Sequence, residues 1–166
     1  MKKYVLGLFA CMAMMAFVSC GSDGEGPIPH DTTPEIATAG TYQGHFHIKW
    51  EDKQGKHELY SPIGTFTFSA TEKTGISSLT ITCPDMDLTI EIPQVNVWYA
   101  GKGFQFSVTG NALVNGTSQL LKIYGLSNDG SLLSAAFVVN VKVGRSTTSY
   151  MYDINDAVKV SDPILE

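Results

Sequence analysis

The sequence predicts an all-β fold, an eight-stranded antiparallel up-and-down barrel that follows an N-terminal signal peptide and a flexible tether. Three observations lead to this prediction. Apolar and polar residues alternate in one segment after another between residues 40 and 156, which is the pattern of strands with one buried face. No stretch in this range shows a convincing helical period. The connections between the segments are mostly short, so the strands close most simply into a barrel.

The N-terminus has the features of an export signal. Two lysines precede an apolar run from residue 5 to residue 18, which is shorter than the roughly 20 residues of a transmembrane helix. Residues 17–20, Phe-Val-Ser-Cys, resemble the lipobox of bacterial lipoproteins, in which the signal is cut before the cysteine and that cysteine carries the lipid. We therefore expect a signal peptide at residues 1–19 and a membrane anchor on Cys20. Ordinary secretory cleavage and a retained helix are the alternatives.

Residues 20–39 are rich in Gly, Pro, Thr and acidic side chains, and this composition predicts a lipidated flexible tether. Asp23 and Glu25 follow Cys20 closely and resemble the surface-export signal of lipoproteins in gut-commensal Gram-negative bacteria. We therefore expect an outer-membrane, lipid-anchored protein at the cell surface rather than on the periplasmic face. Thr32 lies in an Asp-Thr-Thr sequence that resembles the O-glycosylation sequon of such bacteria, with a plain polar linker as the alternative.

Charge and cysteine content narrow the function classes. Loss of the signal peptide lowers the basic residues from 11 to 9 against 16 acidic residues, so the net charge changes from −5 to −7. This balance, without any basic cluster, argues against a nucleic-acid partner. Cys11 leaves with the signal peptide and Cys20 receives the lipid, so Cys83 has no partner for an intramolecular disulfide. We expect Cys83 to be a buried core residue.

The barrel is expected to occupy residues 40–156, with residues 157–166 as a C-terminal tail. Its first strand alternates cleanly, with Tyr42, Phe46 and Trp50 on one face. The eight predicted strands cover residues 41–50, 58–70, 79–83, 86–99, 104–108, 121–125, 133–141 and 150–154.

Two irregularities are expected within these strands. Placing Lys49 opposite Glu58 makes a sensible first hairpin, but it turns Phe66 outward unless a bulge at residues 62–64 restores the phase. Pro93 is expected to bend the fourth strand without ending it.

Each short turn should bring apolar residues of neighbouring strands opposite each other, as antiparallel pairing requires. The connection at residues 110–118 is the one long enough for a crossover, so a two-sheet sandwich is the alternative fold. The expected pairs are Phe66 with Ile81, Ile81 with Leu88, Val97 with Phe106, Ile123 with Ala135 and Val139 with Ile154.

The start of the first strand carries a family resemblance. Residues 40–44, Gly-Thr-Tyr-Gln-Gly, together with the lipobox and the Gly-rich meander, resemble the calycin-like (lipocalin-like) bacterial lipoprotein family of unknown function. True lipocalins have Trp at the third position of this motif, where this chain has Tyr42. The resemblance implies an eight-stranded barrel and almost nothing about activity, because a fold does not determine a function.

The inward faces carry many bulky aromatic residues. Such a lining suits a small apolar ligand, whereas dense aromatic residues are also typical of a filled core. The sequence slightly favours a filled barrel with at most a partial pocket at one mouth. The candidate ligand-binding residues are Phe46, Trp50, Phe66, Phe68, Phe104, Phe106 and Phe137.

Polar candidates for chemistry are sparse. His45 and His47 share one face of the first strand and are weak metal candidates, because no third ligand follows from the pattern. Asp85 and Asp87 follow Pro84 and could form an acid–base pair of carboxylates, but Asp after Pro is typical of a turn. Residues 128–130 form another turn without the spacing of a calcium loop. No nucleophile, zinc or phosphate-loop motif occurs, so neither a cofactor nor a catalytic activity is expected.

The sequence therefore predicts a monomeric, non-catalytic binding module with a membrane anchor, whose ligand would be a small apolar molecule or a protein partner. The alternative function is that of an inhibitor or interaction protein, which engages an external hydrolase or a surface partner through its loops. The polar connections at residues 51–56 and 110–118 are the candidate loops.

Overall fold

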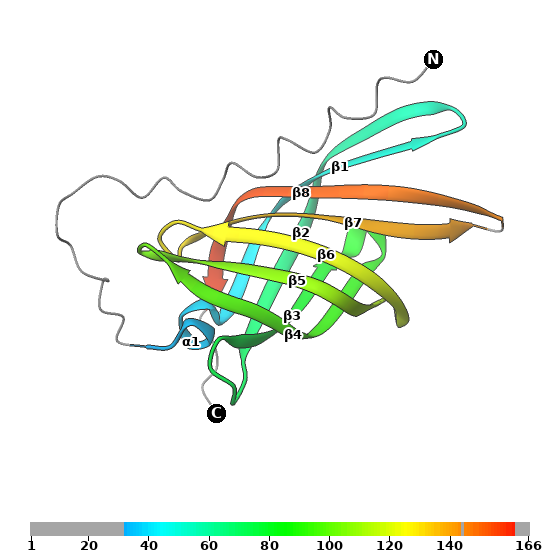
Figure 1. Ribbon diagram of the computed structural model, residues 1–166. Coiled ribbons are helices and arrows are strands. Elements are labelled where there is room, and N and C mark those ends of the chain that lie inside the picture. Colours follow the sequence, from blue (N-terminus) through cyan, green and yellow to red (C-terminus); the bar gives the residue numbers. More distant parts are fainter. Residues whose placement is uncertain (1–31, 144, 162–166) are drawn as a thin grey trace, which may run out of the picture.

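We describe residues 32–143 and 145–161 in a computed structural model of the chain. Each strand pairs antiparallel with the next, and β1 also pairs with β8, so the sheet closes into a barrel (Figure 1). The predicted eight-stranded up-and-down barrel is confirmed, and the sandwich alternative is wrong. The elements are α1 (Pro34–Thr38), β1 (Gly40–Asp52), β2 (Gly55–Ala70), β3 (Ile76–Cys83), η1 (Pro84–Met86), β4 (Leu88–Ala100), β5 (Gly103–Val114), β6 (Thr117–Ser127), β7 (Leu132–Val143) and β8 (Ser146–Ser161).

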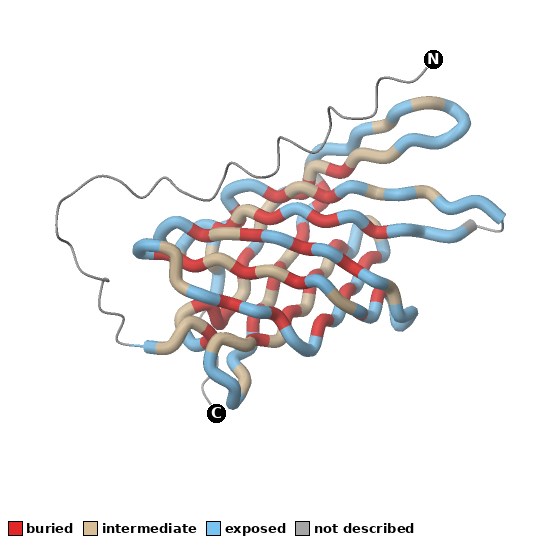
Figure 2. The backbone as a smooth tube through the Cα atoms, in the orientation of Figure 1, coloured by how far each residue is buried: buried red, intermediate tan, exposed pale blue. Residues whose placement is uncertain are grey.

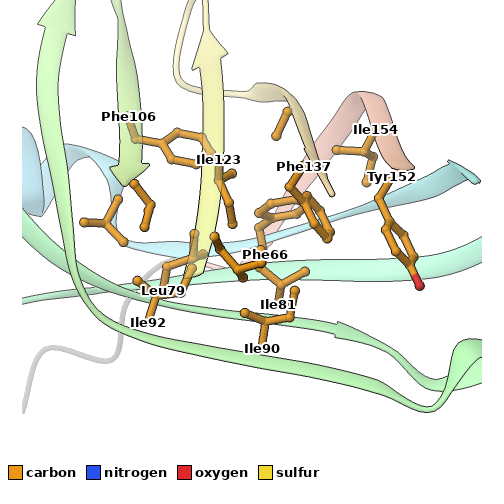
Figure 3. Packing of buried hydrophobic residues seen from close by; sticks show 14 of the residues in the cluster. Phe66, Leu79, Ile81, Ile90, Ile92, Phe106, Ile123, Phe137, Tyr152 and Ile154 are labelled. Atoms are coloured by element: carbon orange, nitrogen blue, oxygen red, sulfur yellow. The ribbon is translucent and has the colours of Figure 1, made fainter. Parts of the chain in front are cut away.

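The residues that alternate between apolar and polar in the sequence lie alternately on the inner and the outer face of the barrel wall. Buried and exposed residues alternate along most strands, as the banding in Figure 2 shows. The buried residues join into one apolar cluster inside the barrel, and Figure 3 shows Leu79, Ile81, Ile90, Phe106 and Phe137 among the side chains that fill it. The core therefore consists of the inward rows of all eight strands.

The first hairpin contains the expected bulge. Ser61 and Pro62 of β2 together face Phe46 of β1, because the register shifts between the pairs on either side of that residue. The shift restores the phase, and Phe66 is fully buried while Ile63 points outward at 45% exposure. Pro93 also behaves as predicted, since it lies within the continuous strand β4.

Several registers differ from the predicted pairs by an even number of residues. Phe66 pairs with Ile81 and Val97 with Phe106, as expected. However, Ile81 pairs with Ile90, Ile123 with Phe137 and Val139 with Tyr150. A shift by two or four residues keeps every side chain on its face, so the alternation cannot distinguish these registers.

The turn between β3 and β4 explains the first of these shifts. Pro84–Met86 forms a single 3-10 turn and Asp87 adopts a left-handed conformation with φ of 47°. The connection is therefore longer than the predicted two-residue turn, and Met86 belongs to it rather than to β4.

The suspected crossover at residues 110–118 is instead a tight hairpin. β5 continues to Val114 and β6 begins at Thr117, so only Asn115 and Gly116 form the turn. Both residues have positive φ, 48° and 74°, as a type I′ turn requires. Asn-Gly is the strongest short hairpin signal in a sequence, so this connection was predictable.

The folded domain extends beyond both of its predicted boundaries, residues 40 and 156. Part of the expected tether forms α1, in which Glu35 and Thr38 are buried. Part of the expected C-terminal tail belongs to β8, which continues to Ser161 beside the beginning of β1. The Glu35 carboxylate accepts the backbone N–H of Gly75 at 2.7 Å, which binds α1 to the β2–β3 turn. The signal peptide, Cys20 and the acidic pair after it lie outside the described residues.

Candidate binding surface at the open end of the barrel

The phenylalanines expected to line a ligand cavity are packed against one another. The exposure of all six is at most 3%. Phe68 contacts Phe106 edge to face at 5.0 Å between ring centroids, and Phe46 contacts Phe137 at 5.9 Å. Figure 3 shows Phe66, Phe106 and Phe137 directed toward the middle of the barrel. These side chains form the core, which leaves Trp50 as the one candidate with a partly exposed ring.

At one end of the barrel, the strands β7, β8, β1 and β2 extend further than the other strands. The β2–β3 ladder begins at Thr65, and the β6–β7 ladder ends at Phe137, so the outer halves of β2 and β7 lack these neighbours. β7, β8, β1 and β2 nevertheless remain paired with one another beyond these points. Figure 1 shows the β1–β2 and β7–β8 hairpins projecting from the body, at the end opposite α1. We call this projecting sheet the open end.

Three aromatic rings stand side by side on the inner face of the open end. Trp50 lies directly opposite His57 on β2 and Tyr150 on β8. Its ring stacks on His57 at 5.0 Å and lies 5.5 Å from the ring of Tyr150. All three residues are partly exposed. We call Tyr150, Trp50 and His57 the aromatic ridge.

A carboxylate holds one end of the ridge in place. His57 Nε2 and Asp52 Oδ1 are 2.9 Å apart, and the same oxygen accepts the backbone N–H of Gln54 at 2.7 Å. The hydrogen bond with His57 is the main cause of a lowered pKa of Asp52. The hairpin turn and the imidazole are thus linked through one carboxylate.

The outer face of the same hairpin carries the predicted histidine pair. His47 stacks on Tyr60 at 3.9 Å, and its Nε2 lies 3.5 Å from Glu58. Tyr60 donates its hydroxyl hydrogen bond to Glu58 at 3.2 Å. His45 is an exposed neighbour on β1. Within residues 32–143 and 145–161 no three His, Cys, Asp or Glu side chains are grouped so that they could hold a metal ion.

The other candidates have structural surroundings. Cys83 is buried and unpaired, and burial raises the pKa of its thiol. Asp129 Oδ1 accepts hydrogen bonds from the backbone and hydroxyl of Ser131, which is turn chemistry rather than calcium binding. Thr32 is exposed, and its carbonyl accepts a hydrogen bond from the Tyr99 hydroxyl, so it lies against the barrel.

Sequence reasoning found Trp50 but missed its two partners in the ridge. The register of the first hairpin already placed His57 opposite Trp50, and this signal was sufficient to find that pair. Tyr150 was missed because it meets Trp50 across the ladder that closes the barrel between β1 and β8, and no local turn sets that register.

Comparisons of the chain with protein-family models, with curated proteins and with solved structures each gave no match. In the part of the chain that the structure describes, no helix has the length and apolar character needed to cross a membrane.

Proposed function

We propose that this chain is a non-catalytic binding module that is anchored to the outer membrane by a lipid on Cys20, displayed at the cell surface, and holds a protein partner with the open end of its barrel. The observation that carries the proposal is the contrast between a core filled by phenylalanines and a partly exposed aromatic ridge. An external hydrolase or another surface protein is a suitable partner.

The chemistry of the ridge suits a protein interface. Trp and Tyr dominate the binding energy of many interfaces, because they bury large rigid surfaces and carry one polar group each. Apolar residues surround the ridge on both faces of the open end, where Leu59 is 38% exposed, Tyr60 62% and Met151 46%. Exposed apolar side chains grouped on one projecting element are typical of interaction surfaces.

The position of the open end also suits this role. Twelve residue steps separate Cys20 from Thr32, a span of at most about 40 Å. A lipid on Cys20 would therefore keep the α1 end of the barrel near the membrane. The open end lies at the other end of the barrel (Figure 1) and would face away from the membrane.

Site-specific photo-crosslinking in the bacterium that makes the protein tests the proposal. Benzoylphenylalanine would replace Leu59, which is on the same face of β2 as His57, and in a control it would replace Leu120, which is 67% exposed on β6. We expect a discrete protein adduct from position 59 and none from position 120. Trp50→Ala and Tyr150→Ala should each abolish the adduct while circular dichroism still reports a folded barrel. Equal adducts from both positions, or none from position 59, would contradict the proposal.

The hypothesis that the barrel binds a small apolar ligand has a separate test. Fatty acids, sterols and bile acids would be titrated while tryptophan emission is recorded. Because the core is packed, we expect none of these compounds to give a saturable change that depends on a core residue such as Phe106. A saturable change that Phe106→Leu abolishes would instead support a ligand inside the barrel.

The anchor is tested by Cys20→Ser. This variant should accumulate as an uncleaved precursor without lipid and remain in the aqueous phase of a detergent partition. Maturation and detergent partitioning like the parent protein would contradict lipidation.

A further inference from the structure

The ladder between β4 and β5 is interrupted, although the barrel as a whole is closed. The two strands pair up to Glu91 and again from Asn96, but residues 92–95 and 108–112 have no partner across this boundary. The segment of β5 stays fully paired with β6, whereas β4 has a bulge against β3, where Pro93 and Gln94 together face Ser78. Pro93 contributes to the separation because it has no backbone N–H to donate.

Two surface depressions flank this interruption. One has a volume of about 410 Å³ and a mostly apolar lining, which includes Leu79, Ile92 and Leu113. The other has a volume of about 330 Å³ and a more polar lining, and Pro93 and Asn111 belong to both. The first volume is in the range of sites for small molecules, roughly 300–1,000 Å³.

One charged residue borders the depressions. Glu91 lines the apolar depression directly opposite Leu113 in the β4–β5 ladder, and the polar depression has no charged residue in its lining. Across residues 32–143 and 145–161, no ion pair or side-chain hydrogen bond engages the Glu91 carboxylate. Cross-strand neighbours have Cβ atoms about 4.5–5.5 Å apart, so an anion and an apolar contact lie side by side.

We propose that the apolar depression beside this interruption binds a small amphipathic cation, whose apolar body packs on the exposed side chains of Pro93 and Leu113 and whose ammonium pairs with Glu91. Charge complementarity selects a cation, because the lining contains one carboxylate and no basic group. Asn111 adds an amide oxygen that can accept a further hydrogen bond from the ammonium. An anion of the same shape would be repelled by the Glu91 carboxylate, because the lining of the depression contains no positively charged side chain.

The site is independent of the proposed partner surface. Its residues come from β3 to β6, whereas the aromatic ridge comes from β1, β2 and β8. Failure of one proposal therefore leaves the other unaffected.

Matched fluorescent probes test the cation site. The mature lipidated protein would be placed in phosphatidylcholine vesicles, and energy transfer from its tryptophans to a dansyl probe would be measured. One probe is dansylcadaverine, which ends in an ammonium, and the other is a dansyl amino acid of matched length, which ends in a carboxylate. We expect saturable transfer with the cation and binding at least two- to fivefold weaker for the anion, as one exposed ion pair allows.

Two variants locate the site. Glu91→Gln should weaken binding of the cation about two- to fivefold and remove the preference over the anion. Ser118→Phe, which places a large side chain at the edge of the apolar depression, should abolish binding of both probes. Glu72→Gln and Leu120→Ser are matched exposed controls outside the depressions and should change nothing. Equal affinity of the parent protein for both probes, an unchanged preference in Glu91→Gln, or normal binding by Ser118→Phe would overturn the proposal.

Discussion

At the scale of single residues, two glycines make room for the aromatic core. A Cβ at Gly64 would lie 1.8 Å from the ring of Phe46, and one at Gly125 would lie 2.2 Å from the ring of Phe106. Neither glycine has a positive φ, so space rather than backbone conformation requires them. Each ring therefore lies over the glycine of a neighbouring strand and occupies the space that a side chain would fill.

Gly125→Ala should therefore destabilise the protein by about 1–3 kcal/mol, the usual cost of overpacking a core. Gly110→Ala is the matched control, because no atom lies within 4 Å of its Cβ position. That variant should be neutral or stabilising by up to about 1 kcal/mol. Urea unfolding measures both, and equal effects would show that Phe106 does not occupy the space above Gly125.

The burial of the Tyr152 phenol leads us to expect that the protein loses stability at high pH. Its side chain is 3% exposed, and burial is the main cause that raises its pKa to about 12. The unfolded chain would ionise this phenol near its ordinary value of about 10. Stability from this group is thus fully present below pH 10 and is lost as the pH rises from about 10 to about 12. Tyr152→Phe should lose less stability than the parent in this range, as thermal unfolding across these pH values would reveal. An identical decline in both proteins would rule out this role.

At the scale of elements, α1 acts as a fixed part of the barrel end. Besides the contact of Glu35 with Gly75, the Thr38 hydroxyl donates to the carbonyl of Pro34 at 3.0 Å and lies 3.4 Å from the hydroxyl of Ser77. A five-residue helix is too short to be stable alone. Its order therefore comes from these contacts with the barrel.

Glu35→Ala should destabilise the protein by about 1–3 kcal/mol, because it leaves the N–H of Gly75 without its acceptor. Glu35→Gln keeps an acceptor oxygen and should recover part of the loss. Ile36→Ala, at a residue with 42% exposure, should cost less than about 0.5 kcal/mol. Denaturant unfolding would compare the three variants, and equal stabilities would mean that α1 does not contribute to the fold.

At the scale of the whole molecule, closure joins all strands into one unit. Because β1 pairs with both β2 and β8, the first strand completes the wall together with the last. One apolar cluster fills the interior, so no part of the barrel can separate without exposing the rest of the core. Cys83 is buried and has no disulfide partner among the described residues.

Unfolding should therefore be a single transition that does not depend on redox conditions. Tryptophan emission and far-ultraviolet circular dichroism should give the same midpoint, with and without a reducing agent. Separate midpoints for the two signals, or a clear drop on reduction, would contradict a single closed unit without disulfides.

The strand count, the up-and-down order and the inward residues follow from the amino-acid pattern alone. Alternation places Phe106 and Phe137 inside under any even register, so these assignments survived the errors in pairing. Phe66 lies inside because of the bulge that the first hairpin required. The Asn115-Gly116 hairpin and the pairing of Trp50 with His57 were also within reach of local rules.

The registers, the formation of α1 and the shape of the open end depend on long-range contacts in the folded barrel. Alternation has a period of two, so it cannot distinguish Phe137 from Ala135 as the partner of Ile123. α1 is too short for a local signal and depends on contacts with distant strands. Tyr150 joins Trp50, and β4 parts from β5, only where the closed wall positions them. Such juxtapositions depend on pairing between residues far apart in the chain, which local patterns do not encode.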